Sequence, residues 1–390
     1  MATTLPFVDL KTQFALLEPA IRERMDAVLN HGQYIMGPEI EELEGRLARF
    51  VGSRHAVACG SGTDALLMAL LALGVGPGDA VFTSPFTFVA TAEVVSLLGA
   101  TPVFVDIDPR TFNMAPEALS QAVAAMRTKD PLAYPLPANY ADLAPKAIIA
   151  VDLFGLAADY DAIRAVADEA GLPVIEDAAQ SLGAGYKGRV AGNLGLIGCT
   201  SFFPAKPLGC YGDGGMCFTD DPELDALLRS IRNHGQGRDR YENVRVGING
   251  RLDTLQAAIL LAKLDGYPED IRMRDRVAAG YTELLGDLVP TPVIPEGYTS
   301  VWAQYTVMAQ NSQERDRIRR ALAEDGIPTA VYYPKPLHLQ KAFAPCGYSQ
   351  GVLPVSESAS HSVFSLPMHP YVSLESQKVA AQSIRRALAG

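Results

Sequence analysis

Between residues 56 and 220 the chain alternates two kinds of segment, and this alternation narrows the possible folds more than any other property of the sequence. Short runs typical of strands alternate with runs that have apolar residues at helical spacing: HAVAC, TDALLMALLAL, AVFTSP, FVATAEVVSLLG, TPVFVDID, PEALSQAVAAM, KAIIAVDLFG, YDAIRAVADEAG, LPVIEDAA, GCTSFFP and GGMCFTD. Such alternation favours right-handed crossovers and a mainly parallel sheet with helices on both faces. We therefore predict an α/β fold whose ligands gather at the carboxyl ends of the strands.

A length of 390 residues exceeds what one hydrophobic core usually serves, so we expect two domains. The stretch 251–285 predicts a long helix, after which SVWAQYTVMA is typical of a strand and ERDRIRRALAEDG of a helix. We predict a large domain with an N-terminal helical segment over residues 1–264, and a smaller C-terminal α/β domain over 265–390. The segment 127–146 carries four prolines and little periodicity, which predicts a surface excursion.

Composition argues against several classes of protein. A net charge of -11 disfavours non-specific binding to nucleic acid, and the six histidines show no metal-ligand spacing, so we expect no metal. The longest apolar run, Ala65 to Val75, is too short to span a membrane and predicts a buried helix. The first residues lack a basic region followed by an apolar core, so we expect no secretory signal and a cytoplasmic protein. Five cysteines without a CxxC pair predict reduced thiols and no disulfide.

Lys206 lies in SFFPAKPLGCYGDGG, where a strand runs out into a loop and Pro204 and Pro207 flank the lysine. An amine in a partly desolvated pocket is the side chain that forms Schiff bases with carbonyl compounds. A lone lysine in a turn is more often simply solvated. The catalytic interpretation of Lys206 therefore depends on partners elsewhere in the sequence.

Asp177 in LPVIEDAAQS is the first such partner, because it ends a predicted buried strand while Glu176 points to the opposite face. The ring of pyridoxal 5'-phosphate (PLP) acts as an electron sink when a buried carboxylate keeps its pyridine nitrogen protonated. An acidic residue at a strand end can equally be a helix cap or a metal ligand. Gln180, three residues further on, is a candidate to hydrogen-bond the ring hydroxyl.

The segment GSGTDA, residues 60–65, predicts an anion site. It follows the strand HAVAC and opens a helix, so free backbone amides and the helix dipole would face a bound phosphate. A helix start without any ligand is the alternative. The segment also matches the dinucleotide pattern G-x-G-x-x-A of nicotinamide dehydrogenases, but that pattern needs an acidic residue at the end of the second strand, where Thr83, Ser84 and Pro85 stand. Ser201 could add a hydroxyl to the phosphate.

Phe88, just past the second predicted strand, could stack on a flat heterocycle, although an aromatic residue there is often part of the core. Each of these signals is modest when taken alone. In this order along the chain, an anion loop, an aromatic residue, a strand-end carboxylate and a proline-flanked lysine together favour a PLP site.

Five stretches resemble the DegT/DnrJ/StrS family of sugar-nucleotide aminotransferases in order and spacing over nearly the whole chain: GSGTDALLMAL, SPFTFVATAE, VIEDAAQSLGA, TSFFPAKPLGCYGDGG and NGRLDTLQAAIL. Within the family, the stretches DLKTQ, HGQYIMGPEIEELE, VDIDPRTFN, FFPAKPLGCYGDGG and SLPMHPY are most similar to members that aminate UDP-2-acetamido-2-deoxy-3-oxo-glucuronate. The resemblance implies PLP-dependent transferase fold type I, as in aspartate aminotransferase. It also implies L-glutamate as amino donor, a homodimer, and a role in lipopolysaccharide O-antigen sugar biosynthesis.

The resemblance implies a role for each candidate side chain. Lys206 holds the cofactor as a Schiff base and is the catalytic residue. The implied cofactor contacts are Gly62, Thr63, Phe88, Asp177, Gln180, Ser201 and, from the second subunit, Asn249. Arg251 in NGRLD meets the sugar carboxylate, for which a planar two-pronged donor is suited, although a surface salt bridge is the alternative. Tyr332, Tyr333 and His338 are candidate substrate contacts.

Two departures from the family pattern affect only the expected substrate contacts. The segment 127–146 is longer than the usual connection, and Tyr332 stands where similar sequences have histidine. Other members aminate dTDP-3-keto or NDP-4-keto sugars, and the related dehydratases replace the lysine with histidine, so Lys206 argues against a dehydratase. A noncatalytic PLP-fold regulatory protein is the alternative from another class.

Overall fold

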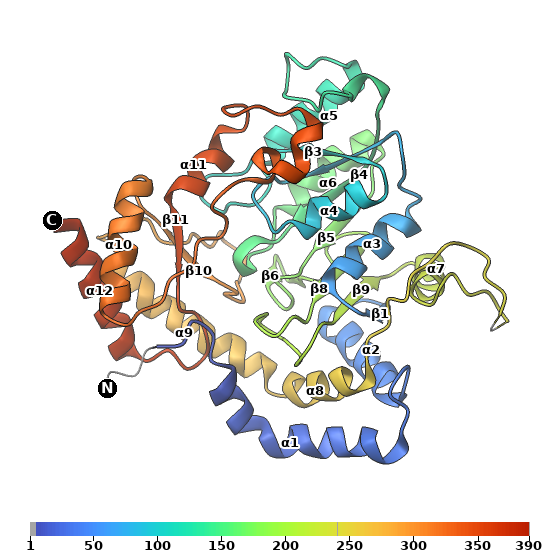
Figure 1. The fold of residues 1–390 in the computed structure, drawn as a ribbon, viewed down its shortest axis with the longest axis horizontal. Helices are drawn as coiled ribbons and strands as arrows, with labels where there is room; N and C mark the ends of the chain where they lie inside the picture. Colours follow the sequence, from blue (N-terminus) through green and yellow to red (C-terminus); the bar gives the residue numbers. More distant parts are fainter. Residues whose placement is uncertain (1–4, 240, 390) are drawn as a thin grey trace.

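A seven-stranded sheet forms the centre of the larger, N-terminal part of the protein (Figure 1). The structure, a computed structural model, describes residues 5–239 and 241–389. The strands of the sheet stand in the order β1-β9-β8-β5-β4-β2-β3. Their bounds are β1 His55–Cys59, β2 Asp79–Thr83, β3 Thr101–Phe104, β4 Ala144–Val151, β5 Val174–Asp177, β8 Ile197–Ser201 and β9 Gly215–Thr219. Six of these strands run in one direction and β9 runs in the opposite direction, which confirms the predicted mainly parallel sheet.

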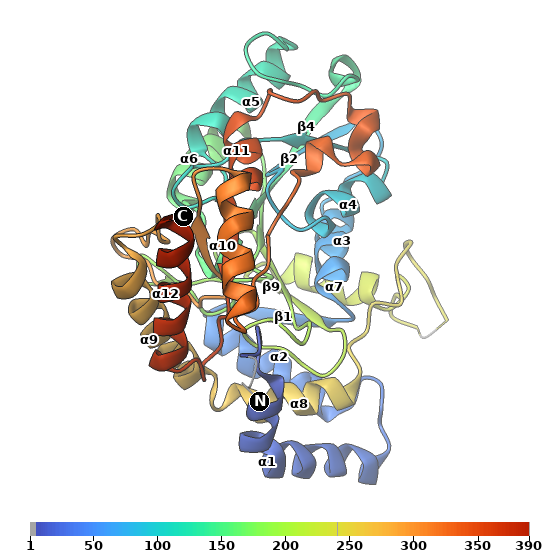
Figure 2. The ribbon, with the colours of Figure 1, turned by 60° about the vertical axis from the view of Figure 1, so that its left-hand side comes forward.

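Helices cover both faces of this sheet (Figure 2). One face carries α3 Gly62–Ala72, α4 Ala90–Leu97 and α7 Pro222–Arg232. The other carries α5 Pro116–Thr128 and α6 Tyr160–Ala170, with α2 Pro38–Val51 and α8 Thr254–Leu264 over its β1 edge. In β4, Ile148 packs toward α5 and α6 while Ile149 packs toward α3 and α4. Strands with two buried faces are apolar throughout, which is why the sequence pattern located them.

The C-terminal part has a small sheet and a core of its own. Its elements are α9 Tyr267–Leu285, β10 Tyr305–Met308, α10 Ser312–Glu324, α11 Pro354–Ser362, β11 Val363–Leu366 and α12 Leu374–Ala389. Strands β10 and β11 pair antiparallel, and Tyr281, Tyr305 and Phe364 are buried between them and the helices. The division at residue 264 falls between α8 and α9 and stays a proposal. Residues 1–4, 240 and 390 of the two proposed domains lie outside the described residues.

The prediction of a single long helix over 251–285 is wrong, because the chain forms α8 and α9 with a break at Asp265 and Gly266. Pro268 stands in the first turn of α9, and a proline there cannot donate the hydrogen bond that would continue a helix from α8. The helical spacing of apolar residues persists across this break, so periodicity alone did not reveal it.

The remaining segments pack around this frame. Helix α1 Leu10–His31 lies along α8, and a short hairpin joins β6 Gly185–Tyr186 to β7 Arg189–Val190. The segment after α5, predicted as a surface excursion, exposes Leu132 but buries Tyr134, whose hydroxyl accepts from the Asp106 amide at 3.0 Å. This segment is therefore anchored to the core rather than lying wholly on the surface.

All five cysteines are buried and carry free thiols. Within the part of the chain that the structure describes, no helix has the length and apolar character needed to cross a membrane.

Candidate active site

The predicted cofactor residues follow four strands that end at the same edge of the large sheet. Strands β2, β5 and β8 belong to the parallel set, and β1 points the same way because β9 is antiparallel to both β1 and β8. GSGTDA follows β1, Phe88 follows β2, Asp177 ends β5, and Lys206 follows β8. The fold therefore brings segments more than 100 residues apart to one edge.

Asp177 is buried at the end of β5 and makes two hydrogen bonds. Thr91 in α4 donates its hydroxyl to Asp177 Oδ2 at 2.8 Å, and the Ala179 amide donates to Oδ1 at 3.2 Å. Burial raises the pKa of Asp177, while these two bonds and the Lys206 charge act in the opposite direction. Because these contacts do not fully offset the cost of burying its negative charge, the Asp177 carboxylate favours a cationic partner, such as a protonated ring nitrogen.

Lys206 lies in a tight loop after β8, and its amide donates to the Phe203 carbonyl at 2.8 Å. A Cβ on Gly209 would stand 2.6 Å from the Pro204 carbonyl oxygen, so only glycine permits this turn. Burial lowers the pKa of the Lys206 amine, and the charge of Asp177 opposes that shift in part. A lowered pKa increases the fraction of neutral amine, which is the nucleophilic and basic form.

The start of α3 forms a cradle for an anion. Ser61 caps the helix by accepting the Asp64 amide at 3.0 Å, while Gly62 and Thr63 occupy the first turn, where helical amides have no intrahelical acceptor. A Cβ on Gly62 would lie 2.7 Å from the Ser201 Cβ, so β8 and the helix start approach as closely as glycine allows. This geometry fits a phosphate held between the two segments.

Gln180, three residues after Asp177, is buried, and its side chain hydrogen-bonds two other parts of the chain, at Phe154 and Tyr333. Its Oε1 accepts from the Phe154 amide at 2.7 Å, and its Nε2 donates to the Tyr333 hydroxyl at 3.2 Å. Tyr333 was predicted as a substrate contact, and the structure brings it to the predicted cofactor residue Gln180. Phe88 is 56% exposed, so the alternative that it belongs to the core is wrong and its ring is free to stack.

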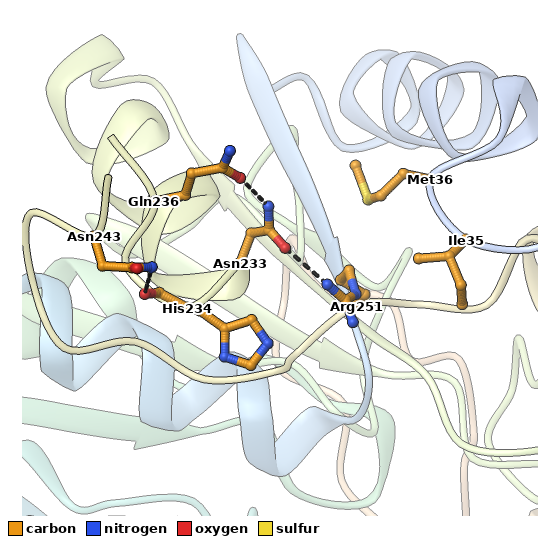
Figure 3. A pocket seen from close by; sticks show the side chains of 7 residues that line it. All are labelled: Ile35, Met36, Asn233, His234, Gln236, Asn243 and Arg251. Atoms are coloured by element: carbon orange, nitrogen blue, oxygen red, sulfur yellow. Dashed lines mark hydrogen bonds between the residues drawn. The ribbon is translucent and has the colours of Figure 1, made fainter. Parts of the chain in front are cut away.

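Arg251 lines a separate pocket of about 660 Å³, shared with Ile35, Met36, Asn233, His234, Gln236 and Asn243 (Figure 3). Its Nη1 donates to Asn233 Oδ1 at 2.8 Å, while its Nε is buried without a hydrogen-bond partner in the described part of the chain. The surface salt bridge considered as an alternative does not form with any described residue. Neither Lys206 nor Asp177 lines this pocket.

Three other predicted residues lie in different surroundings. Asn249 is exposed, which leaves its side chain accessible to a second subunit. Tyr332 is half-buried with its ring 6.3 Å from that of Phe7. His338 is buried, and its Nε2 lies 3.1 Å from Glu357 Oε1, a contact that accounts for its position structurally. The proposed substrate contacts of Tyr332 and His338 stay predictions.

Two side chains at the site carried no sequence signal that could have identified them. Thr91 reaches Asp177 only because α4 packs over the end of β5, and Asn233 meets Arg251 only because the chain doubles back after α7. Threonine and asparagine are common in helices and turns, so neither stands out in the sequence.

The residues present fit PLP. The buried carboxylate matches the ring nitrogen of PLP, and the amine with a lowered pKa matches its aldehyde. The exposed aromatic ring matches the face of the PLP ring, and the glycine cradle matches the phosphate. The fold and this site define a PLP-dependent transferase of fold type I.

The chain belongs to the DegT/DnrJ/EryC1/StrS aminotransferase family, which it matches over residues 16–385. It is 51% identical to the UDP-2-acetamido-2-deoxy-3-oxo-D-glucuronate aminotransferase of Pseudomonas aeruginosa, over 97% of this chain and 99% of that protein. It is 42% identical to the UDP-N-acetyl-3-dehydro-alpha-D-glucosamine 3-aminotransferase of Acidithiobacillus ferrooxidans, over 100% of this chain and 99% of that one.

Solved structures agree with this assignment. A DegT DnrJ EryC1 StrS aminotransferase from Brucella abortus superposes with a TM-score of 0.92 at 49% identity, covering 98% of this chain and 99% of that one. The NtdA protein of Bacillus subtilis, solved with bound pyridoxamine phosphate, gives a TM-score of 0.85 at 28% identity, with coverage of 100% and 86%. The protein is therefore a PLP-dependent aminotransferase, and the predictions of fold, family and cofactor are confirmed.

Proposed function

We propose that this aminotransferase moves an amino group from L-glutamate to the 3-keto carbon of UDP-2-acetamido-2-deoxy-3-oxo-glucuronate, for lipopolysaccharide O-antigen sugars. The observation that carries the proposal is the 51% identity, over nearly the full length of both chains, to a Pseudomonas aeruginosa protein of that name. A relative named for the neutral sugar is less similar, at 42% identity.

Arg251 supports a substrate that carries a carboxylate. No described carboxylate lies within ion-pair distance of its guanidinium, so its positive charge is available for a ligand. Guanidinium binds carboxylate through two parallel hydrogen bonds, which gives both attraction and orientation. A neutral hexose offers no such partner.

The chain's own residues carry out the proton transfers. PLP supplies, when bound, an electron sink that stabilises the charge left when a proton is removed from the adjacent carbon. Lys206 Nζ, whose pKa burial lowers, accepts a proton in its neutral form from the donor amino acid and later returns it as the acid. Asp177 keeps the ring nitrogen protonated, and Gly62, Thr63 and Ser201 hold the phosphate so that Lys206 meets the reacting carbon.

The active enzyme is a homodimer with shared sites. Asn249 and Arg251 follow a segment, residues 234–239 and 241–248, that projects from the body beyond α7 (Figures 1 and 2). Arg251 and Lys206 line no common pocket within one described chain, which supports a site that a second subunit completes with its Arg251. The dimer works in the cytoplasm, where glutamate and nucleotide sugars are at hand.

Single-turnover absorbance spectroscopy tests the substrate. The pyridoxamine phosphate form is mixed in turn with UDP-2-acetamido-2-deoxy-3-oxo-glucuronate, a dTDP-3-keto sugar and an NDP-4-keto sugar. We expect rapid return of the PLP absorbance with the UDP-linked uronate alone. Return of that absorbance only with a 4-keto sugar would contradict the assignment.

The same instrument separates an enzyme from a noncatalytic regulatory protein. Glutamate added to the PLP form should convert it to the pyridoxamine phosphate form and release 2-oxoglutarate. A PLP spectrum that glutamate leaves unchanged would favour the regulatory alternative.

A further inference from the structure

Arg251 has a neighbour whose placement bears on substrate choice. We infer that Asn233 is a positioning residue that holds the Arg251 guanidinium for the sugar carboxylate, and so sets the preference for a uronate over a neutral sugar. This inference rests on the proposed function, because it concerns how the same substrate is selected.

A short chain of hydrogen bonds fixes the orientation of Asn233 (Figure 3). Its Oδ1 accepts from Arg251 Nη1 at 2.8 Å, and its Nδ2 donates to Gln236 Oε1. An amide can rotate by half a turn, but the Gln236 oxygen requires a donor and Arg251 requires an acceptor. Only one orientation satisfies both, so the oxygen faces the guanidinium.

The backbone holds both ends of this contact. Asn233 ends α7, and the chain returns beside it, with the His234 amide donating to the Ile248 carbonyl at 2.9 Å. The Gly250 amide then donates to the Arg232 carbonyl at 3.0 Å. Arg232 is itself buried and pairs with Glu44 at 2.7 Å. The residues flanking Asn233 and Arg251 are thus tied together and to α2.

A neutral partner orients an arginine without cancelling its charge. An aspartate at position 233 would pair with Arg251 and compete with a substrate carboxylate, whereas the amide oxygen uses one guanidinium proton and leaves the net charge intact. Arg251 Nε is buried and has no partner among the described residues, so the guanidinium keeps donors for a ligand. A hydrogen bond from such a desolvated donor contributes most binding free energy when its acceptor is an anion.

Two stable ligands that differ only at the sugar C6 position measure the preference directly. UDP-N-acetylglucosaminuronate carries a carboxylate there and UDP-N-acetylglucosamine a hydroxymethyl group. Calorimetric titration of the PLP-loaded enzyme gives Kd for each, and their ratio defines the uronate preference. The variants are Asn233→Ala, Asn233→Asp and Arg251→Ala. Asn139→Ala serves as a control, because among the described residues the Asn139 side chain bonds only Thr101, at an exposed site.

We expect Asn233→Ala to reduce the uronate preference about tenfold, the usual effect of losing a hydrogen bond to a charged group. Asn233→Asp keeps the contact but neutralises the guanidinium, so it should reduce the preference at least as much. Arg251→Ala should abolish the preference, and Asn139→Ala should retain it. The Kd of UDP-N-acetylglucosamine should stay near the wild-type value in the Asn233 variants, because that ligand has no sugar carboxylate. The far-UV circular dichroism spectrum and the thermal unfolding midpoint of each variant show whether the fold is intact.

The outcomes separate the inference from the function. If Arg251→Ala abolishes the preference while both Asn233 variants keep it, the positioning role is wrong and the proposed function stands. If the wild type shows no preference, or Arg251→Ala leaves it unchanged, the uronate assignment through Arg251 fails and the inference fails with it.

Discussion

Asp177 presents a buried carboxylate that Thr91 alone among the described side chains supplies with a hydroxyl donor. Replacing Asp177 by Asn keeps the shape and removes the charge that holds the ring proton. We expect kcat for Asp177→Asn to fall about 100-fold, as when an electrostatic stabiliser is removed from an active site. Steady-state kinetics with saturating PLP measures the effect.

Thr91→Val serves as the matched comparison, because it removes only the hydroxyl that donates to Asp177 at 2.8 Å. Loss of this bond, together with the contact of the same hydroxyl with Thr87 Oγ1 at 3.1 Å, should reduce kcat about tenfold. Equal and small losses in both variants would show that the Asp177 charge is not the important feature.

Individual site residues were predictable from the sequence where chemistry limits the choice of residue type. Lys206, Asp177 and the glycine of the anion cradle have few substitutes, and they lie at strand ends that the apolar pattern located. Thr91 and Asn233 were not predictable, since their contacts depend on how α4 and α7 pack. His338 was predicted as a substrate contact, yet its Nε2 lies 3.1 Å from Oε1 of Glu357, nineteen residues further along the chain.

Among the elements, α8 supports the loop that presents Lys206. Lys263 in α8 is buried and donates to the Gly209 carbonyl at 2.7 Å, and burial lowers its pKa from 10.5 to about 8. Between about pH 8 and about pH 10 the unfolded chain binds this proton more than the folded chain does. Lys263 therefore makes the folded state more stable as the pH rises through this window, by about 2 kcal/mol.

Lys263→Met keeps most of the side-chain volume and removes the titration. We measure the thermal unfolding midpoint of wild type and variant at about pH 8 and about pH 10. The wild-type midpoint, relative to that of the variant, should be higher at about pH 10 than at about pH 8. Midpoints that move in parallel would mean that Lys263 does not have the lowered pKa.

The element pattern was largely predictable, because buried parallel strands and amphipathic helices leave distinct periods in the sequence. All seven strands of the large sheet match predicted runs. The break between α8 and α9 was missed because its cause is local, in Gly266 and Pro268, while the apolar spacing continues. The buried Tyr134 was missed because the prolines around it suggested only a surface loop.

For the whole molecule, the shared-site dimer predicts complementation between two defective chains. Lys206→Ala removes the catalytic amine, and Asn249→Asp places a carboxylate against the cofactor phosphate of the partner. A mixed dimer then has one site with both residues intact, so random subunit exchange should restore roughly a quarter of wild-type activity. If each site is built from one chain, mixing restores nothing.

Lys206 is the residue on which the whole account depends, and its replacement by Ala or Arg tests the account most directly. The loop after β8 places its amine at the strand edge beside Asp177, with a pKa lowered by burial. We expect neither variant to turn over glutamate and keto sugar, while PLP still binds noncovalently and shows the absorbance of a free aldehyde. Full turnover by either variant, measured with the same substrates, would contradict the account.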